Sequence, residues 1–409
     1  MAEKRKPGLL VLASTYPRWK DDHEPGFVHE LCKRLAGSFD VVALVPDAPG
    51  ADPDGLLDGV DVVRYRYAPR WLQTLVNDGG IASNLRRARW KWLLLPGFVA
   101  GQYLAARRLL ATGRFDAIHA HWLVPQGLVA RAIARRGTIA YVVTSHGGDL
   151  FGLRGRLMTA LKRRAAAGAA AMTVVSSAMR EEAARIGLHP PRIEVLPMGV
   201  DFSARFVADP GIVRERDRLL FVGRLVPKKG LRHLLDAMPA VLARRPRTVL
   251  DIVGFGPEEP ALRQQAARLG VASQVRFLGA LPQHELPAHF RRASVFVAPF
   301  VRDPSGDQEG LPVALMEAIG CGCPVIAGAV PGLQDLLGAQ QAEVCVVPED
   351  GERLTAMILD ALADPQAAAE RAAMIRETAA GQVDWERIAA GYATLIQACI
   401  ARSAGGHGR

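Results

Sequence analysis

The amino-acid sequence predicts an α/β protein built from two doubly wound domains. Short apolar runs rich in valine and isoleucine alternate with longer helical patterns along nearly the whole chain. Because these runs are mostly apolar throughout, they are typical of parallel strands that helices cover on both faces. The alternation stops over residues 197–217, where proline, glycine and polar residues indicate a linker, and then restarts.

Each half of the chain contains one series of strands and helices. In the first half the predicted strands are 9–13, 41–45, 60–65, 117–120, 139–144, 171–175 and 193–196, and the predicted helices include 28–35, 127–134 and 179–185. In the second half the predicted strands are 219–222, 249–253, 275–278, 295–298, 324–327 and 344–347, and the predicted helices are 231–242, 258–269, 311–319 and 353–362. These two βαβ series predict domains at 1–203 and 204–384, with a final helix at 385–401 that packs back on the first domain. Ligands are expected at the carboxyl ends of the strands, in a cleft between the domains.

The composition indicates a folded protein of a reducing compartment. Hydrophobic residues make up 49% of the 409 residues and charged residues 22%, which excludes an intrinsically disordered chain. The five cysteines are an odd and scattered set, so they predict no disulfide framework, and none lies in a cluster with zinc-ligand spacing. Cys321 and Cys323 are interpreted as small packing residues after a helix.

Neither a membrane-spanning helix nor a secretion signal is predicted. The most apolar stretch, 93–106, is shorter than the roughly 18–20 residues that a span needs, and proline and glycine interrupt it. The apolar run at 8–13 follows three basic residues but is short for a signal, so it is interpreted as a buried first strand. We therefore expect a cytoplasmic protein.

A basic and aromatic region lies between Arg70 and Arg114. It carries eight arginine or lysine residues against one acidic residue, Asp78, and tryptophans are interspersed among them. This pattern favours peripheral binding to an anionic membrane surface, here the inner face of the plasma membrane. The alternative is an arginine-rich helical hairpin whose aromatic side chains pack inward. The sequence has no helix-turn-helix, zinc-finger or RNA-binding motif, so nucleic acid is not an expected partner.

The first motif with chemical meaning follows the strand at 219–222. Its sequence is Gly223-Arg224-Leu225-Val226-Pro227-Lys228-Lys229-Gly230, and a predicted helix comes next. Arg224 and Lys229 bring two cations to a helix N-terminus, which itself favours anions, so the motif suits a diphosphate. The alternative is a glycine turn with basic surface residues.

The second motif is a pair of glutamates, Glu309 and Glu317, eight positions apart. If both belong to one helix, Glu317 lies two turns after Glu309 on a broadly similar side. Glu309 is then expected at the junction of loop and helix, facing the cleft. The backbone N–H groups of Gly310 and Leu311 would be free to bind a phosphate. The alternative is one glutamate at a helix start and one exposed helical glutamate.

Together the two motifs resemble the retaining nucleotide-sugar glycosyltransferases of family 4. That family has a G-R-L-x-x-x-K-G segment followed by E-x7-E about eighty residues later, and here Gly223 and Glu309 are 86 positions apart. The resemblance extends over nearly the whole chain. It implies the GT-B fold, in which two Rossmann-like domains face each other across a cleft.

The resemblance also implies roles for individual residues. Arg224 and Lys229 would hold the donor diphosphate, Glu309 the hydroxyls of the donor sugar and Glu317 the nucleotide ribose. His146, in a segment similar to the family's H-G-x-D, would approach the donor sugar or the acceptor, and His121 at a neighbouring strand end would face the acceptor. Arg276 and Leu278 would frame the base, largely through their backbone. The remaining donor-binding residues are Gly26, Gly223, Gly310 and Leu311.

The reaction that the resemblance implies needs no cofactor and no metal ion. The acceptor oxygen attacks from the side of the leaving group, configuration is retained without a protein nucleophile, and the departing phosphate takes the proton. Arg224 and Lys229 would stabilise the charge on the leaving diphosphate. Asp52 and Asp54 form the sequence's one D-x-D, which is interpreted as a turn in the first domain and not as a metal site.

The expected activity is transfer of a hexose from a UDP- or GDP-sugar. The acceptor is expected to be lipid-linked, on a polyprenyl diphosphate, or a saccharide, in the synthesis of an envelope polysaccharide or glycolipid. One alternative is a GT-B nucleotide-sugar epimerase, which needs no basic aromatic surface. A second alternative is a non-catalytic protein that binds sugar nucleotides at the membrane.

Overall fold

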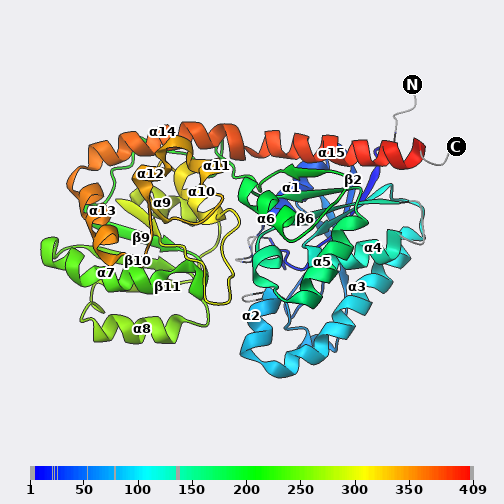
Figure 1. The fold of residues 1–409 in the computed structure, drawn as a ribbon, viewed down its shortest axis with the longest axis horizontal. Helices are drawn as coiled ribbons and strands as arrows, with labels where there is room; N and C mark the ends of the chain where they lie inside the picture. Colours follow the sequence, from blue (N-terminus) through cyan, green and yellow to red (C-terminus); the bar gives the residue numbers. More distant parts are fainter. Residues whose placement is uncertain are drawn as a thin grey trace. The chain divides into compact units, whose positions relative to one another are not determined.

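The computed structural model describes residues 5–20, 22, 24, 26–52, 54–77, 80–134 and 139–405. The chain divides into two compact units (Figure 1). Unit 1 comprises Met1–Met198 and Trp385–Arg409, and unit 2 comprises Gly199–Asp384. Unit 1 ends after Met198 and not after residue 203, because Val200 already pairs with the end of unit 2, where its N–H donates to the Val383 carbonyl over 2.9 Å. The predicted cleft between the two domains stays a prediction.

Unit 1 contains an eight-stranded sheet in the order β3-β4-β2-β1-β5-β6-β7-β8. Its strands are β1 (Gly8–Leu12), β2 (Asp40–Pro46), β3 (Gly55–Leu57), β4 (Val60–Tyr65), β5 (Ala117–His121), β6 (Ala140–Ser145), β7 (Ala171–Val174) and β8 (Ile193–Val195). Neighbouring strands are parallel except for β3, which pairs antiparallel with β4. A parallel, doubly wound sheet is therefore confirmed, with one short antiparallel edge strand that the sequence did not predict.

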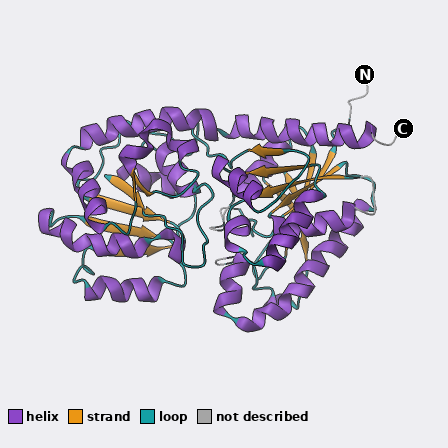
Figure 2. Ribbon diagram, viewed as in Figure 1, coloured by secondary structure: helices purple, strands orange, loops and turns teal. Residues whose placement is uncertain are grey.

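Helices lie on both sides of this sheet (Figure 2). They are α1 (Phe27–Leu35), α2 (Gly80–Arg87), α3 (Leu95–Leu110), α4 (Leu128–Ala134), α5 (Arg156–Ala167), α6 (Ser177–Arg185) and α15 (Trp385–Gly405). Short helical turns are η1 (Arg70–Leu72), η2 (Arg89–Leu94), η3 (Leu123–Gly127) and η4 (Gly148–Gly152).

The C-terminal helix α15 belongs to the core of unit 1. Tyr392, Leu395 and Ile396 are almost fully buried in the same apolar cluster as Leu9 and Val11 of β1. Each such side chain contributes about 1.5–3 kcal/mol by leaving water. The chain therefore returns to its first domain after completing the second.

Unit 2 contains a six-stranded parallel sheet in the order β11-β10-β9-β12-β13-β14. Its strands are β9 (Arg218–Val222), β10 (Val249–Val253), β11 (Val275–Gly279), β12 (Val295–Ala298), β13 (Val325–Gly328) and β14 (Cys345–Val346). Its helices are α7 (Leu231–Arg244), α8 (Glu259–Arg268), α9 (Leu286–Arg292), α10 (Val313–Gly320), α11 (Gln334–Leu337), α12 (Gln341–Val344), α13 (Gly351–Ala363) and α14 (Pro365–Val383), with turns η5 (Pro227–Lys229) and η6 (Gly338–Gln340).

The central strand β9 of unit 2 is buried on both faces. Along β9, Leu219 and Phe221 join one apolar cluster, and Leu220 and Val222 join another. Because alternate residues of a strand point to opposite faces, two apolar clusters require an uninterrupted apolar run. The uninterrupted apolar run from which this strand was predicted is thus required by the helices that cover both faces of the sheet.

Candidate active site

The glycine-rich turn after β9 is shaped by its last residue, Gly230. This residue has φ 66°, in the left-handed region, and immediately precedes α7. A Cβ atom built on Gly230 would lie 1.8 Å from the carbonyl oxygen of Pro299. Because both the backbone conformation and the close approach require glycine, this position fixes where η5 and its two lysines lie relative to the loop after β12.

Replacing Gly230 with alanine is therefore expected to lower the free energy of unfolding by about 3 kcal/mol, through strain and a backbone clash. Urea denaturation of the variant beside the parent chain measures the loss. Gly351→Ala is the matched control, since no described atom lies within 4 Å of its added Cβ. Equal losses in the two variants would contradict the role assigned to Gly230.

Two lysines from this turn converge on Glu309. Lys229 Nζ lies 3.3 Å from Glu309 Oε2, and Lys228 Nζ lies 3.4 Å from Glu309 Oε1 and 3.4 Å from Asp307 Oδ2. Glu309 Oε1 is buried and accepts no hydrogen bond from any residue in the described part of the chain. The turn and the loop before α10 thus form one charged cluster that contains an acceptor oxygen without a hydrogen bond.

The cluster shifts the pKa values of its members. Burial by itself raises the pKa of Glu309, but the charges of Lys228, Lys229 and Arg224 outweigh burial and lower this pKa to about 2. Burial also lowers the pKa of Lys229, an effect that Glu309 opposes. A fully ionised carboxylate therefore sits among three cations, and the cluster carries a net positive charge that suits a polyanionic ligand.

Lys228 belongs to this charged cluster, although only Lys229 of the two adjacent lysines was singled out from the sequence. It is buried, and its ammonium group bridges Asp307 and Glu309. Its backbone carbonyl also accepts a hydrogen bond from the N–H of Val301 over 3.0 Å. The motif Gly223–Gly230 contains both lysines side by side, but only Lys229 was expected to contact the diphosphate.

The helical relation predicted between Glu309 and Glu317 is wrong. Helix α10 begins at Val313, after Pro312 with ψ 117°, so Glu309 lies in the preceding loop and only Glu317 is helical. A residue before proline is biased away from the helical region, which places the helix start after Leu311. Gly310 and Leu311 therefore belong to the loop, and their N–H groups are not those of a helix N-terminus.

Glu317 is buried to 4% exposure and has a polar partner that the sequence did not reveal. Gln283 Nε2 donates to Glu317 Oε1 over 2.5 Å. Burial raises the pKa of Glu317 to about 8, against the smaller opposing effects of Gln283 and Arg205. The two glutamates of the motif therefore have opposite electrostatic character, one ionised and the other protonated at neutral pH.

The residues expected near the base lie on β11. The Arg276 guanidinium donates to the buried carboxylate of Asp251 over 2.6 Å, and Leu278 is partly exposed. Because the Arg276 side chain is already paired with Asp251, we expect Arg276 to contact a base only through its backbone.

In unit 1, three histidines gather at the carboxyl ends of β5 and β6. His121 Nδ1 lies 2.9 Å from His146 Nε2, and the His119 ring packs 4.2 Å from the His121 ring. His121 is fully buried and its Nδ1 contacts His146, so its role on the acceptor side stays a prediction. His146 keeps partial exposure beside Phe27 and Trp122.

Asp149 holds the turn that carries His146. Its carboxylate accepts hydrogen bonds from the Leu123 N–H over 2.7 Å, the Ser145 hydroxyl over 2.9 Å and the His146 N–H over 3.1 Å. The buried Asp149 side chain therefore links the two loops that follow β5 and β6. The aspartate of the H-G-x-D segment therefore has a structural role, which is to hold these two loops together.

Gly26 is the residue that precedes α1. Its carbonyl accepts the N–H of Glu30 over 2.9 Å, and its φ of −88° is open to other residues. An added Cβ would meet only Pro17, at 3.9 Å. Pro25, which belongs to the same predicted loop, lies outside the described residues.

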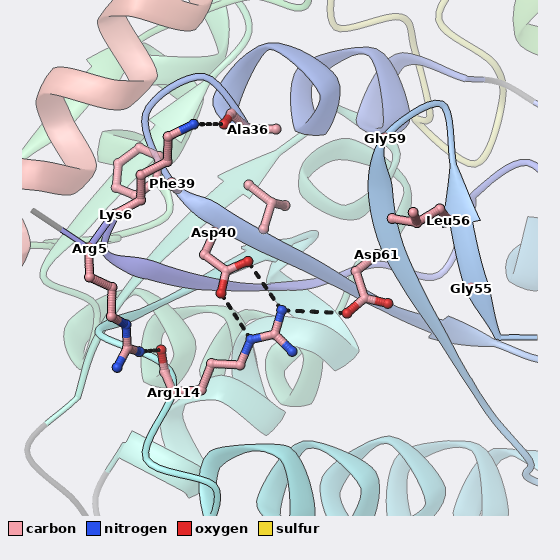
Figure 3. A pocket seen from close by; sticks show the side chains of 11 residues that line it. Arg5, Lys6, Ala36, Phe39, Asp40, Gly55, Leu56, Gly59, Asp61 and Arg114 are labelled. Carbon is pink, nitrogen blue, oxygen red and sulfur yellow. Dashed lines mark hydrogen bonds and ion pairs between the residues drawn. The ribbon is translucent and has the colours of Figure 1, made fainter. Parts of the chain in front are cut away.

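A hollow of about 670 Å³ lies elsewhere in unit 1, at the amino ends of its strands (Figure 3). Arg114 binds Asp40 over 3.0 Å and Asp61 over 3.5 Å, and Arg5 and Lys6 donate to backbone carbonyls. The charged side chains that line the hollow are thus bound to other groups of the protein. The hollow lies at the amino ends of the strands, whereas the histidines lie at the carboxyl ends. We assign no ligand to it.

The basic and aromatic region forms η1, α2, η2 and α3. Trp71 is 75% exposed, Trp92 58% and Leu93 81%, whereas Phe98 is fully buried against Tyr65. The alternative of inward-packed aromatics therefore fails for the tryptophans of η1 and η2. Asp78, the one acidic residue of this region, lies outside the described residues. Among the described helices, none is long and apolar enough to cross a membrane.

Metal-ligating residues do not cluster in the part of the chain that the structure describes: no three His, Cys, Asp or Glu side chains are placed to hold an ion. Asp54 of the D-x-D segment accepts the Arg64 N–H over 2.7 Å, and the Asp52 carbonyl accepts from the Arg64 side chain. Both aspartates thus contact the same arginine.

Comparison with known proteins finds two matching family models. "Glycosyltransferase Family 4" matches residues 27–204, and "Glycosyl transferases group 1" matches residues 204–381. A GDP-mannose-dependent alpha-(1-6)-phosphatidylinositol monomannoside mannosyltransferase of Mycolicibacterium smegmatis is 33% identical over 343 residues, covering 81% of this chain and 89% of the relative. A glycogen synthase of Mycobacterium tuberculosis is 29% identical over 415 residues, covering 95% and 94%. The solved sucrose-phosphate synthase of Thermosynechococcus elongatus has a similar fold, with a TM-score of 0.79 and 20% identity over 97% of this chain and 100% of that one.

Proposed function

The chain belongs to the glycosyltransferases of family 4, and from this premise we propose that it transfers a hexose from a nucleotide sugar with retention of configuration. The donor is a UDP- or GDP-sugar. The acceptor is a lipid-linked glycan, on a polyprenyl diphosphate or another glycolipid, or else a saccharide. GDP-mannose is the first donor to test, because the mycobacterial relative is named for it.

One observation carries this proposal for the donor site. Lys228, Lys229 and Arg224 lower the pKa of Glu309 in unit 2, and one oxygen of Glu309 accepts no hydrogen bond from the described residues. A diphosphate meets the cations, and a sugar hydroxyl donates to Glu309 Oε1, which has an ion-pair contact with Lys228 but accepts no hydrogen bond from the described residues. Glu317 then hydrogen-bonds the ribose, and β11 frames the base.

The proposed chemistry breaks the bond between the anomeric carbon and the diphosphate oxygen. Negative charge grows on the diphosphate, where Arg224 and Lys229 stabilise it. The acceptor oxygen bonds to the anomeric carbon from the same side, and its proton passes to the departing phosphate. Neither a protein nucleophile nor a metal ion takes part.

Release of nucleoside diphosphate from a panel of UDP-, GDP- and ADP-sugars tests this function, with a membrane extract supplying acceptors. Glu309→Gln and Arg224→Ala are expected to lose at least 100-fold in rate with one donor. Glu343→Gln, a surface change in unit 2, is the control and should leave release unchanged. Tight binding of a donor without release would favour a non-catalytic protein, and sugar interconversion without transfer would favour an epimerase.

We also propose that unit 1 binds an anionic membrane surface through η1, α2 and η2. Exposed Trp71, Trp92 and Leu93 would enter the interface while neighbouring arginines contact lipid phosphates. Lys91 is excluded from this role, since its ammonium donates to Thr74 O and Asn84 Oδ1 within the protein. Peripheral attachment at the inner face of the plasma membrane would bring the site to a lipid-linked acceptor.

Co-sedimentation with vesicles that contain anionic lipid measures this attachment. Replacing Arg86, Arg87 and Arg89 with glutamine is expected to weaken binding at low salt by about 3 kcal/mol, or over 100-fold, at about 1 kcal/mol per cation. The control removes the same charge from unit 2, at the exposed residues Arg244, Arg247 and Arg268. Equal losses in both variants would show that only net charge matters.

A further inference from the structure

His121 and His146 share one hydrogen bond between neighbouring strands of unit 1. Their closest nitrogens, His121 Nδ1 and His146 Nε2, are 2.9 Å apart. The ring planes differ by 13°, and the ring centroids are 5.1 Å apart. The rings are therefore joined edge to edge in nearly one plane, which is the geometry of an N–H···N hydrogen bond.

Each ring of this group carries a single proton. Burial lowers the pKa of His119 and of His146 to about 3 and the pKa of His121 well below its usual value. All three imidazoles are therefore neutral at physiological pH. In a neutral pair one ring donates and the other accepts, so the direction of the bond fixes both tautomers.

The burial of His121 selects the direction. Its other nitrogen, Nε2, is buried and has no hydrogen-bond partner among the described residues. A proton on Nε2 would leave a buried N–H without an acceptor, which proteins tolerate less readily than a lone pair without a donor. The proton therefore belongs on His121 Nδ1, where it has a partner.

We propose that His121 is a positioning residue: its Nδ1–H donates to His146 Nε2 and thereby holds His146 as the tautomer with its proton on Nδ1. His146 is the one of the three rings with exposed surface. It then offers a ligand an N–H donor and has no free basic nitrogen. A sugar or phosphate oxygen suits such a donor, whereas removal of a proton from the acceptor does not.

A second hydrogen-bond chain determines the tautomer of His119 independently. Tyr392 donates to the Leu196 carbonyl over 3.0 Å, which leaves its oxygen to accept from Thr173. Thr173 then accepts from Thr144 over 2.6 Å, so Thr144 must accept from His119 Nε2–H over 2.7 Å. His119 therefore presents a bare Nδ1 and no N–H that could bind His121 in place of His146.

Nitrogen NMR of the full chain with 15N-labelled histidine tests the tautomer without any ligand or activity. Protonated and bare ring nitrogens have distinct shifts, and Nδ1 and Nε2 are told apart by their couplings to ring protons. His146 is expected to be protonated on Nδ1 and bare on Nε2 at pH 7, with the reverse pairing for His119. A His146 protonated on Nε2 would overturn the proposal.

Substitution of His121 then links the tautomer to turnover. His121→Asn keeps an N–H near the Nδ1 position and is expected to keep the His146 tautomer, whereas His121→Leu is expected to lose it and to lower kcat about 10- to 100-fold. His189→Leu, at an exposed histidine of unit 1, is the control. An unchanged His146 spectrum in folded His121→Leu protein would also overturn the proposal.

The expected effect of His121 substitution on kcat rests on the proposed transfer reaction. Failure of that reaction and failure of the positioning role give different results. If no donor is turned over by the parent chain, the transfer reaction fails while the NMR result still decides the tautomer. If turnover is present and both His121 variants lose kcat equally despite different His146 tautomers, the positioning role fails.

Discussion

Replacing Lys229 with methionine is expected to lower kcat/KM for the donor sugar about a thousandfold. Lys229 Nζ is 3.3 Å from Glu309 Oε2 and, in the proposed reaction, faces the diphosphate as its charge develops. Removal of one preorganised donor from such a site costs about 100- to 1000-fold. Loss of a full charge places the effect at the upper end, and nucleoside-diphosphate release over a range of donor concentrations measures it.

The same substitution is expected to lower the free energy of unfolding by about 3 kcal/mol, because Glu309 stays buried with one cation fewer. In the parent chain the pKa of Glu309 is about 2, below its ordinary 4.5. Its charge therefore stabilises the fold above pH 4.5, and this contribution is lost as the pH falls through 2. With Lys229→Met the pKa of Glu309 rises, so the loss on acidification begins at higher pH.

A double variant separates the two effects of Lys229. Lys229→Met combined with Glu309→Gln removes the uncompensated charge, so it is expected to recover most of the stability and none of the activity. Lys20→Met, at an exposed lysine, controls for loss of a positive charge in general. If the double variant unfolds as easily as the single one, the loss comes from the packing of Lys229 over the Phe300 ring, 5.0 Å from its ammonium, and not from charge.

Most of the fold could be predicted because it is encoded locally. The central strands of both sheets, such as β1, β6 and β12, read as apolar runs because helices cover both faces and all of their residues are buried. Strand β3 was missed because three residues carry no periodic pattern, and Leu56 in it is largely exposed. Its pairing depends on the turn that returns it to β4, not on burial.

The candidate site was predictable where a motif is continuous in sequence. Gly223–Gly230 lies in one turn, and its lysines reach Glu309 because β9 and β12 are neighbours in the sheet. Partners from distant segments were not predictable. Gln283 meets Glu317 from 34 positions away, and Tyr392 meets Thr173 from 219 positions away. Such contacts follow from strand order and from the return of α15, which local patterns do not specify.

The start of α10 shows how one residue changes a helical inference. The spacing of Glu309 and Glu317 suggested a shared helix face, but Pro312 between them starts the helix at Val313. One glutamate was thereby placed in a loop among cations, and the other on a helix in an apolar core. Their opposite pKa shifts follow from these surroundings and not from their spacing.

Replacing Glu317 with glutamine is expected to remove a pH dependence of stability between pH 4.5 and 8. Burial raises the pKa of Glu317 to about 8 from its ordinary 4.5, so between these values the folded chain holds a proton that the unfolded chain has released. The free energy of unfolding therefore falls as pH rises through this window. At about 1.4 kcal/mol per pH unit, the loss has an upper limit of about 5 kcal/mol.

Urea denaturation at pH 5, 6, 7 and 8 measures this effect as the difference between the parent chain and Glu317→Gln. Other titrating groups cancel in that difference, and glutamine keeps an oxygen that accepts from Gln283. Glu309→Gln is the control, because the pKa of Glu309 is shifted in the opposite direction. The free energy of unfolding of this variant is expected to differ from that of the parent by an amount that changes with pH only below pH 4.5. Parallel curves for Glu317→Gln and the parent would mean that Glu317 is ionised when folded, as the Glu309 carboxylate is. In the proposed site an ionised Glu317 could only accept hydrogen bonds from the ribose hydroxyls, whereas a protonated Glu317 can also donate one.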